Sequence, residues 1–273
     1  MNVYISADIE GINGVVSSAE TEPLTPEWAR MRKLMMGEVN AAVEGALAAG
    51  AQEILVNDSH SSMKNLMLED LHPAATLLSG GGKMWSMMAG IDRRFDAVFF
   101  IGYHARAGST PATIDHTYWG PDSVQGVWLN GIEVGESGLN GALAGYFGVP
   151  VALLTGDQTA CAQAREFFGE HLETVVVKQA ISRSAAINYA PSRVQEMIRS
   201  AAARTLARAH LPYVLAAPIT LRVQYARSSQ ADRAEFLPDA KRIGPRLVEY
   251  THEDYGHVFK AFYAFMILGD VKT

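Results

Sequence analysis

The chain has 273 residues, of which 48% are hydrophobic and 19% charged, and its formal net charge is −6 at pH 7. This size and composition predict a globular protein with one large domain or two smaller ones. The acidic balance and the lack of a long basic run argue against nucleic acid as a partner.

No export or membrane signal is predicted. The N-terminal residues lack a basic segment followed by an apolar one, so we expect no signal peptide. The late apolar stretch from Val258 to Leu268 contains Lys260 and is too short for a transmembrane helix. Cys161 is the single cysteine, which excludes an intrachain disulfide and a cysteine zinc cage, and we expect it to pack in the core. A cytoplasmic protein without a membrane partner fits best.

The first hundred residues alternate predicted strands and helices. Short apolar runs predict strands at residues 2–7, 53–57, 75–78 and 96–102. Helices are expected between them, at residues 26–49, 62–71 and 83–90. The first helix has Thr25 as N-cap and a proline at its first position. This alternation predicts an α/β fold with a mostly parallel sheet flanked by helices.

The second half is more varied. After a loop at 105–123, residues 124–134 predict a hairpin that turns at Asn130-Gly131. The elements expected after it are helices at 136–147, 193–209, 230–236 and 253–267, a helix capped by Asp157, and strands at 150–155, 175–177, 219–225 and 246–250. We therefore expect an α/β metal-binding catalytic domain over residues 1–190 and a smaller C-terminal α+β domain over 191–273.

Side chains able to bind a metal follow three of the predicted strands. Asp8 and Glu10 come at the end of the first strand, two residues apart, so both point to the same side. His60 follows the second strand and His104 the strand at 96–102. The carboxyl ends of parallel strands meet at one edge of the sheet, where α/β folds bind ligands. Like charges on one face repel unless a cation lies between them, so these residues predict a metal site.

Glu136 is the best candidate for a fifth ligand, since glycines near it allow close backbone approach. Carboxylates combined with imidazoles suit Zn²⁺, Mn²⁺ or Co²⁺ better than Ca²⁺ or Mg²⁺. Five such ligands could hold two ions, with one carboxylate bridging, and two-metal sites activate water. Taken singly, each residue also has an ordinary interpretation, as a loop acid, a turn cap or a hydrogen-bonded histidine at a strand end.

His116 lies in the loop that follows His104 and is a candidate catalytic acid or base. The alternative is a surface histidine next to Asp115. Asp58 either fixes the ring of His60 or closes a local turn with Ser59 and His60.

Two lysine segments remain ambiguous. The run Ser79–Lys83 does not match the spacing of a phosphate-binding loop, so we expect a flexible turn. Lys178 and the segment Ser182–Ser184 follow a strand end, and they either contact a substrate carboxylate or belong to an exposed loop.

Four short segments carry a family resemblance. They are Asp8–Ile12, Val56–Ser61, Gly102–Ala107 and Gly135–Asn140, and Lys178–Ser184 is also similar. In this order along residues 1–185, they resemble the DppA-type zinc-dependent D-aminopeptidases. The resemblance fades in the C-terminal region.

The resemblance implies two zinc ions per chain, bridged by Asp8. The implied ligands that complete the two sites are Glu10 and His60 for one ion and His104 and Glu136 for the other. His116 falls at the position of the family's proposed catalytic histidine. The resemblance also implies a ring-shaped homo-oligomer, such as a decamer, that encloses the active sites and admits short peptides.

We expect a zinc metallopeptidase that hydrolyses short peptides with an N-terminal D-amino acid, through a metal-activated water at a dinuclear site. The preference for a D-residue comes from the resemblance alone, because no residue pattern encodes handedness. One alternative keeps the metals and makes the protein an L-specific dipeptidase or another small-amide metallohydrolase. The other alternative is a non-enzymatic metal-binding oligomer.

Overall fold

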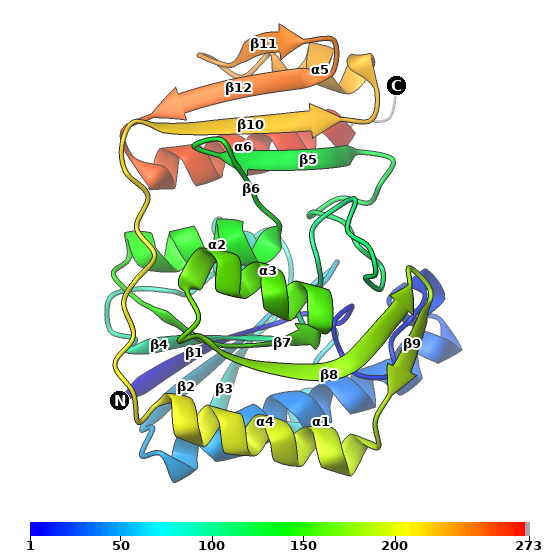
Figure 1. Ribbon diagram of the computed structural model, residues 1–273, viewed down its shortest axis with the longest axis vertical. Helices are drawn as coiled ribbons and strands as arrows, with labels where there is room; N and C mark the ends of the chain where they lie inside the picture. Colours follow the sequence, from blue (N-terminus) through cyan, green and yellow to red (C-terminus); the bar gives the residue numbers. More distant parts are fainter. Residues whose placement is uncertain (271–273) are drawn as a thin grey trace.

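Two β-sheets form the framework of the protein (Figure 1). A computed structural model describes residues 1–270 of the chain. The strands of the first sheet are β1 (Asn2–Ala7), β2 (Glu53–Asp58), β3 (Ala75–Leu78), β4 (Ala97–Ile101), β7 (Val151–Asp157), β8 (Glu173–Ser182) and β9 (Ala185–Asn188). Their order in space is β3-β2-β1-β4-β7-β8-β9, and all neighbours pair in parallel except β8 and β9. The predicted mostly parallel sheet is confirmed.

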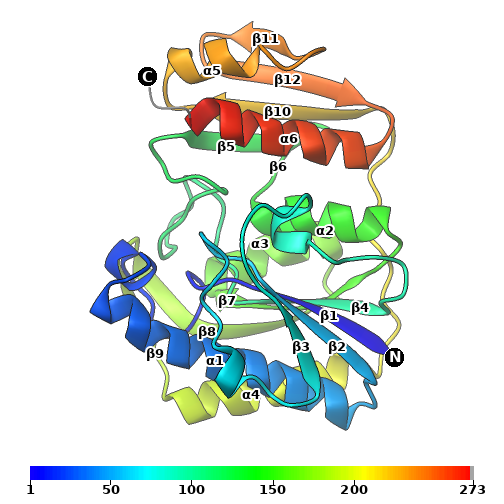
Figure 2. The same ribbon diagram turned by 180° about the vertical axis from the view of Figure 1, so that it is seen from behind.

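The second sheet is antiparallel and lies at the other end of the molecule (Figure 2). Its strands are β5 (Val124–Leu129), β6 (Ile132–Glu133), β10 (Ile219–Tyr225), β11 (Lys241–Gly244) and β12 (Leu247–His252), in the spatial order β11-β12-β10-β5-β6. Asn130 and Gly131 both have positive φ, 49° and 82°, as the predicted hairpin turn requires.

Helices cover both faces of the first sheet. The elements are α1 (Pro26–Ala48), α2 (Glu136–Tyr146), α3 (Gln158–Phe168), α4 (Pro191–Thr205), α5 (Ser228–Ala234) and α6 (Tyr255–Asp270). Helices α1 and α4 pack side by side below the first sheet, whereas α2, α3 and α6 lie between the two sheets (Figures 1 and 2). One apolar core lies on each face of the first sheet, and the core between the sheets contains Cys161, which is buried as expected.

The chain crosses between the two sheets more than once. Strands β5 and β6 come from the middle of the sequence and join the second sheet, and α4 packs against α1 below the first sheet. The division into domains at about residue 190 stays a prediction, and residues 271–273 of the predicted C-terminal domain lie outside the described residues.

Two predicted helices are wrong. Residues 62–71 and 83–90 contain only the short 3₁₀ turns η2 (Leu68–Asp70) and η3 (Ser86–Met88). Ser61, Met63 and Ser86 have φ between 47° and 56°, a left-handed conformation that ends any α-helix. A third 3₁₀ turn, η1 (Ser18–Glu20), and the short edge strands β9 and β11 were not predicted.

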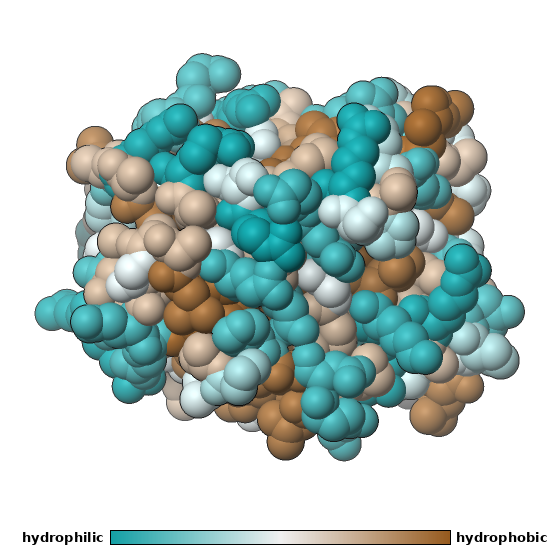
Figure 3. Space-filling model, turned by 90° about the horizontal axis from the view of Figure 1, so that it is seen from below, coloured by the Kyte–Doolittle hydropathy of each residue, from teal (hydrophilic) through white to brown (hydrophobic). Residues whose placement is uncertain are grey.

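The outer surface beneath the first sheet is largely polar. Seen from the side of α1 and α4, hydrophilic residues are interspersed with isolated hydrophobic ones (Figure 3). Helix α4 buries Val194, Ile198 and Ala201 on its inner face, which leaves its polar residues outside. Within residues 1–270, no helix combines the length and the apolar character needed to cross a lipid bilayer.

The loop that follows β1 is fixed from within the protein by Lys178 on β8. This side chain is fully buried, and its ammonium group donates to the carbonyl oxygens of Glu10, Ile12 and Val15, at 2.5, 3.1 and 2.5 Å. All three N–H groups of the lysine are therefore used. The expectation that Lys178 contacts a substrate carboxylate or lies in an exposed loop is wrong.

Replacing Lys178 with methionine should destabilise the protein by about 3 kcal/mol or more, because each buried carbonyl left without a donor costs roughly 1–3 kcal/mol. Urea denaturation of the zinc-free protein measures this change. Lys33→Met on the exposed side of α1 is the matched control, and we expect it to change stability by less than about 0.5 kcal/mol. Equal stability of the two variants would contradict the role of Lys178.

Candidate metal centre

The predicted ligands meet at the carboxyl ends of three neighbouring strands of the first sheet. Asp8 follows β1, His60 follows β2 and His104 follows β4, and these strands are adjacent in the order β2-β1-β4. Asp8 is fixed where it leaves the sheet, because its N–H donates to the carbonyl of Ile101 at 2.8 Å. Glu136 is the first residue of α2, which lies between the two sheets (Figure 1).

Each of the two histidines faces two carboxylates. His60 Nδ1 lies 2.9 Å from Glu10 Oε1 and 3.5 Å from Asp8 Oδ1. His104 Nε2 lies 3.2 Å from Glu136 Oε1 and 3.6 Å from Asp8 Oδ2. The two oxygens of Asp8 therefore point toward different histidines, and Asp8 occupies the centre of the cluster.

Backbone carbonyls fix the orientation of both rings. His60 Nε2 lies 2.9 Å from the carbonyl oxygen of Thr21, and His104 Nδ1 lies 3.0 Å from that of Ala105. A carbonyl oxygen can only accept, so in each ring this nitrogen carries the hydrogen. In the neutral ring the other nitrogen then carries a lone pair, and this lone pair is directed at the carboxylates. A metal ligand needs this orientation.

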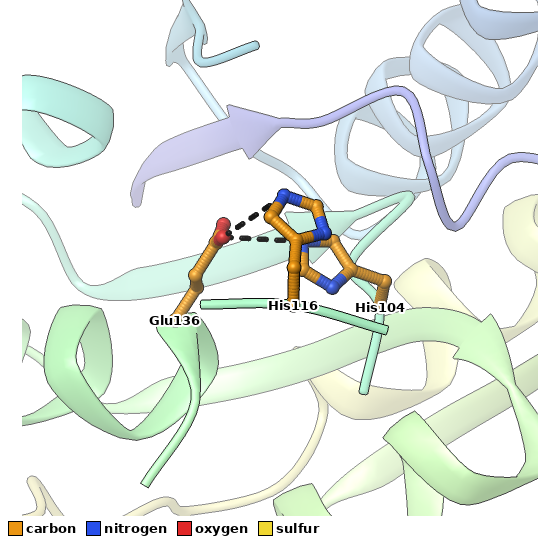
Figure 4. Close-up of side chains that lie close together, drawn as sticks. All are labelled: His104, His116 and Glu136. Atoms are coloured by element: carbon orange, nitrogen blue, oxygen red, sulfur yellow. Dashed lines mark ion pairs between the residues drawn. The ribbon is translucent and has the colours of Figure 1, made fainter. Parts of the chain in front are cut away.

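His116 joins the same cluster, so it is not the surface histidine of the alternative interpretation. Its ring stacks on His104, with 4.0 Å between the ring centres and an angle of 8° between the planes (Figure 4). Its Nδ1–H donates to the carbonyl of Ile114 at 2.8 Å. Its Nε2 lies 3.7 Å from Glu136 Oε1 and 3.8 Å from Glu10 Oε1.

The carboxyl groups and imidazoles perturb one another strongly. Burial and the charge of Glu10 raise the pKa of Asp8 well above its usual value. Burial also tends to raise the pKa of Glu10, but the charge of His60 and its hydrogen bond to Glu10 outweigh this effect, and the pKa of Glu10 lies well below the usual value. Burial alone would lower the pKa of His104, yet Glu136, Asp8 and Glu10 together raise it to about 10.

The cluster fits a bound cation. Asp8 Oδ2, Glu10 Oε2 and His104 Nε2 are buried and have no hydrogen-bond partner among the described residues. Buried polar atoms without partners are rare and costly, and a cation would satisfy all three. Two groups of side chains have candidate ligand atoms within 4.8 Å of one another, namely Asp8, Glu10 and His104, and His104, His116 and Glu136. Oxygen and imidazole donors of this kind suit zinc.

Several supporting residues lack a recognisable sequence signal. Thr21 and Tyr118 act through main-chain groups, and the N–H of Tyr118 donates to Glu136 Oε1 at 2.7 Å. Asp58 accepts the backbone N–H groups of Asn65 and Leu66 and so closes the loop that carries His60. Both expectations for Asp58 are wrong, because within residues 1–270 its carboxylate binds Asn65 and Leu66 rather than the ring of His60 or a turn with Ser59 and His60.

Lys83 also supports this loop rather than a phosphate. Its ammonium group donates to Asn57 Oδ1 at 2.5 Å and to the carbonyl of Asp58 at 2.8 Å. The neighbouring glycines Gly81 and Gly82 line the cleft described next. These contacts agree with the prediction that the segment Ser79–Lys83 is not a phosphate-binding loop.

A cleft of about 1360 Å³ opens above the cluster. Its inner wall includes Asp8, Glu10, His60, His116 and Glu136. The opposite wall comes from the second sheet and its helices, and it includes Arg227, Ser229, Arg233 and Tyr263. The C-terminal region therefore shapes the space in front of the candidate metal centre.

Comparisons of the sequence and of the structure with known proteins all find D-aminopeptidases. Residues 1–264 match the family described as D-aminopeptidase. The D-aminopeptidase of Bacillus subtilis strain 168 is 35% identical, over 99% of this chain and 97% of its own length. A solved structure described as "Zn-dependent D-aminopeptidase DppA from Bacillus subtilis, a self-compartmentalizing protease" is also similar, with a TM-score of 0.96 and 34% identity over 100% of this chain and 99% of that one.

These similarities extend from the first strand through the second sheet, so they include both walls of the cleft as well as the cluster at its floor. The chain belongs to the D-aminopeptidase family of peptidases.

Proposed function

We propose that this protein is a zinc-dependent aminopeptidase that hydrolyses short peptides with an N-terminal D-residue. The observation that carries the proposal is the buried cluster of carboxylates and imidazoles, with three unpartnered polar atoms, at the floor of a large cleft. Membership of the D-aminopeptidase family supports both the reaction and the zinc. The cleft has room for a short peptide, since ligand pockets commonly measure 300–1,000 Å³.

Two zinc ions per chain are proposed, with Asp8 between them. Glu10 and His60 would complete one site, and His104 and Glu136 the other. The direction of the two Asp8 oxygens toward different histidines supports this division. Zinc supplies Lewis-acid chemistry, because it polarises a carbonyl group and makes water a better nucleophile near neutral pH.

His116 is proposed as the group that transfers the proton. Burial and the charge of His104 lower the pKa of His116, so the ring is neutral at neutral pH. Its Nδ1–H is held by the carbonyl of Ile114, which leaves the Nε2 lone pair facing the cleft. The ring can therefore accept a proton there and return it to the leaving amine.

An assembly that encloses the sites is also proposed. The related Bacillus subtilis enzyme is described as self-compartmentalizing. A ring-shaped homo-oligomer, such as a decamer, would limit access to short peptides. The cytoplasmic location stays a prediction.

Purified zinc-loaded protein should hydrolyse D-Ala-D-Ala and not L-Ala-L-Ala, and a chelator should abolish the reaction. Release of free alanine measures both activities. Cleavage of the L-peptide would leave a metal-dependent peptidase but remove the D assignment. Cleavage of neither peptide would contradict the proposed function.

Substitutions should separate metal binding from proton transfer. His104→Ala should lose zinc and activity together, whereas His116→Ala should keep its zinc and lower kcat by about 10²–10⁴. Zinc per chain is measured by atomic absorption. His257→Ala, whose side chain is 60% exposed and distant in sequence, is the control and should match the unmodified protein. Near-normal turnover by His116→Ala would exclude its role.

Zinc binding to the metal-free protein should release protons at pH 7. His104, with a pKa of about 10, is protonated there, and a histidine ring must be neutral to bind zinc. Zinc affinity should accordingly rise with pH up to this pKa. Calorimetric titration in two buffers with different ionisation enthalpies measures the released protons. Binding without proton release would argue against His104 as a ligand.

A further inference from the structure

The backbone on both sides of His116 is strained. Ile114 and Tyr118, two residues before and two residues after it, have φ values of 49° and 60°. A left-handed conformation is costly for any non-glycine residue and especially so for a β-branched one. Such residues persist only where surrounding contacts determine them, so the position of His116 depends on restraints from outside its own loop.

One set of these restraints comes from the tip of the β8–β9 hairpin. Arg183 Nε lies 3.0 Å from Asp115 Oδ1, and Arg183 Nη2 donates to the carbonyl of Asp115 at 3.2 Å. The carbonyl of Arg183 accepts the N–H of Ile114 at 2.9 Å. The guanidinium group of Arg183 thus holds both the carboxylate and the carbonyl of Asp115, and the carbonyl of Arg183 holds the N–H of Ile114.

Asp115 connects this contact to the start of the loop. Its other carboxylate oxygen accepts the N–H of Gly108 at 2.7 Å. The carboxylate of Asp115 therefore connects the two ends of the segment 108–115, and it also pairs with the guanidinium group of Arg183. The side chain of Asp115 is only 11% exposed, whereas that of Arg183 is 50% exposed.

We propose that Arg183 is a positioning residue for His116: it holds the strained 114–118 segment so that the imidazole stays stacked on His104 and directed into the cleft. This inference rests on the proposed role of His116 in proton transfer. A direct contact between Arg183 and substrate is not needed, because within the described residues the lining of the cleft does not include Arg183.

Arg183→Ala should lower kcat about tenfold or more, since a small displacement of a catalytic group has effects of this size. KM should change by less than about twofold, because a positioning residue does not alter substrate binding. Zinc per chain should stay the same, and the unfolding midpoint should fall only slightly, since the guanidinium group of Arg183 is half exposed and Asp115 keeps its hydrogen bond from Gly108. Arg183→Lys, which keeps one charged donor, should recover part of the lost kcat.

Arg222→Ala is the matched control. Arg222 forms an ion pair of 2.8 Å with Glu249 in the second sheet, and its side chain is 46% exposed. Its removal should leave kcat unchanged. Asp115→Ala combined with Arg183→Ala should lower kcat by less than the product of the two single effects, because the two side chains act as one unit.

A second measurement is independent of peptidase activity. Diethyl pyrocarbonate modifies neutral imidazoles, and peptide mass spectrometry follows the rate at His116, whose side chain is 14% exposed. This rate should rise several-fold in Arg183→Ala and stay constant in Arg222→Ala, while the rate at exposed His257 serves as internal reference.

If the unmodified protein cleaves no D-peptide, the proposed function fails, and the rate of His116 modification alone then decides the positioning role of Arg183. An unchanged rate, an unchanged kcat or a loss of zinc in Arg183→Ala would each overturn the proposal.

Discussion

The burial of three carboxylates at one edge of a sheet is the constraint on which the rest of the structure depends. Asp8, Glu10 and Glu136 are each less than 5% exposed and lie close together. The raised pKa of Asp8 relieves part of their mutual repulsion, and the imidazolium charges of His60 and His104 lower the pKa of Glu10 and of Glu136. Since a small displacement would separate the charges from these partners, the loops that carry them must be fixed. Lys178 fixes the loop of Glu10, and Asp58 fixes the loop of His60.

The sequence was sufficient for the fold class and for the members of the cluster. A strand that ends in Asp8 and Glu10, and two later strands followed by His60 and His104, could meet only if the sheet is parallel, and the pairing of β2, β1 and β4 is parallel. Glycines around Glu136 indicated a close approach that α2 provides. In each case the local pattern points to the cluster only when it is combined with the parallel topology, because each residue taken singly has an ordinary interpretation.

Other features depend on contacts that no local pattern records. Residues 62–71 have a composition suited to a helix, but hydrogen bonds from Asn65 and Leu66 to Asp58 impose a loop. Lys178 resembles a surface residue in sequence, and only the fold places three carbonyls of a distant loop around it. The support of Glu136 by Tyr118 uses a backbone N–H, which every residue other than proline possesses.

The place of β5 in the second sheet also has a consequence for biosynthesis. Asn130, at the end of β5, and Thr220, in β10, form hydrogen bonds across 90 residues of chain. During translation, β5 leaves the ribosome long before its main partner, so one of its edges remains unpaired in the nascent chain. Pairings over such a distance form slowly, and an exposed apolar edge is prone to aggregation. The yield of folded protein should therefore depend on translation speed and chaperones more than its final stability suggests.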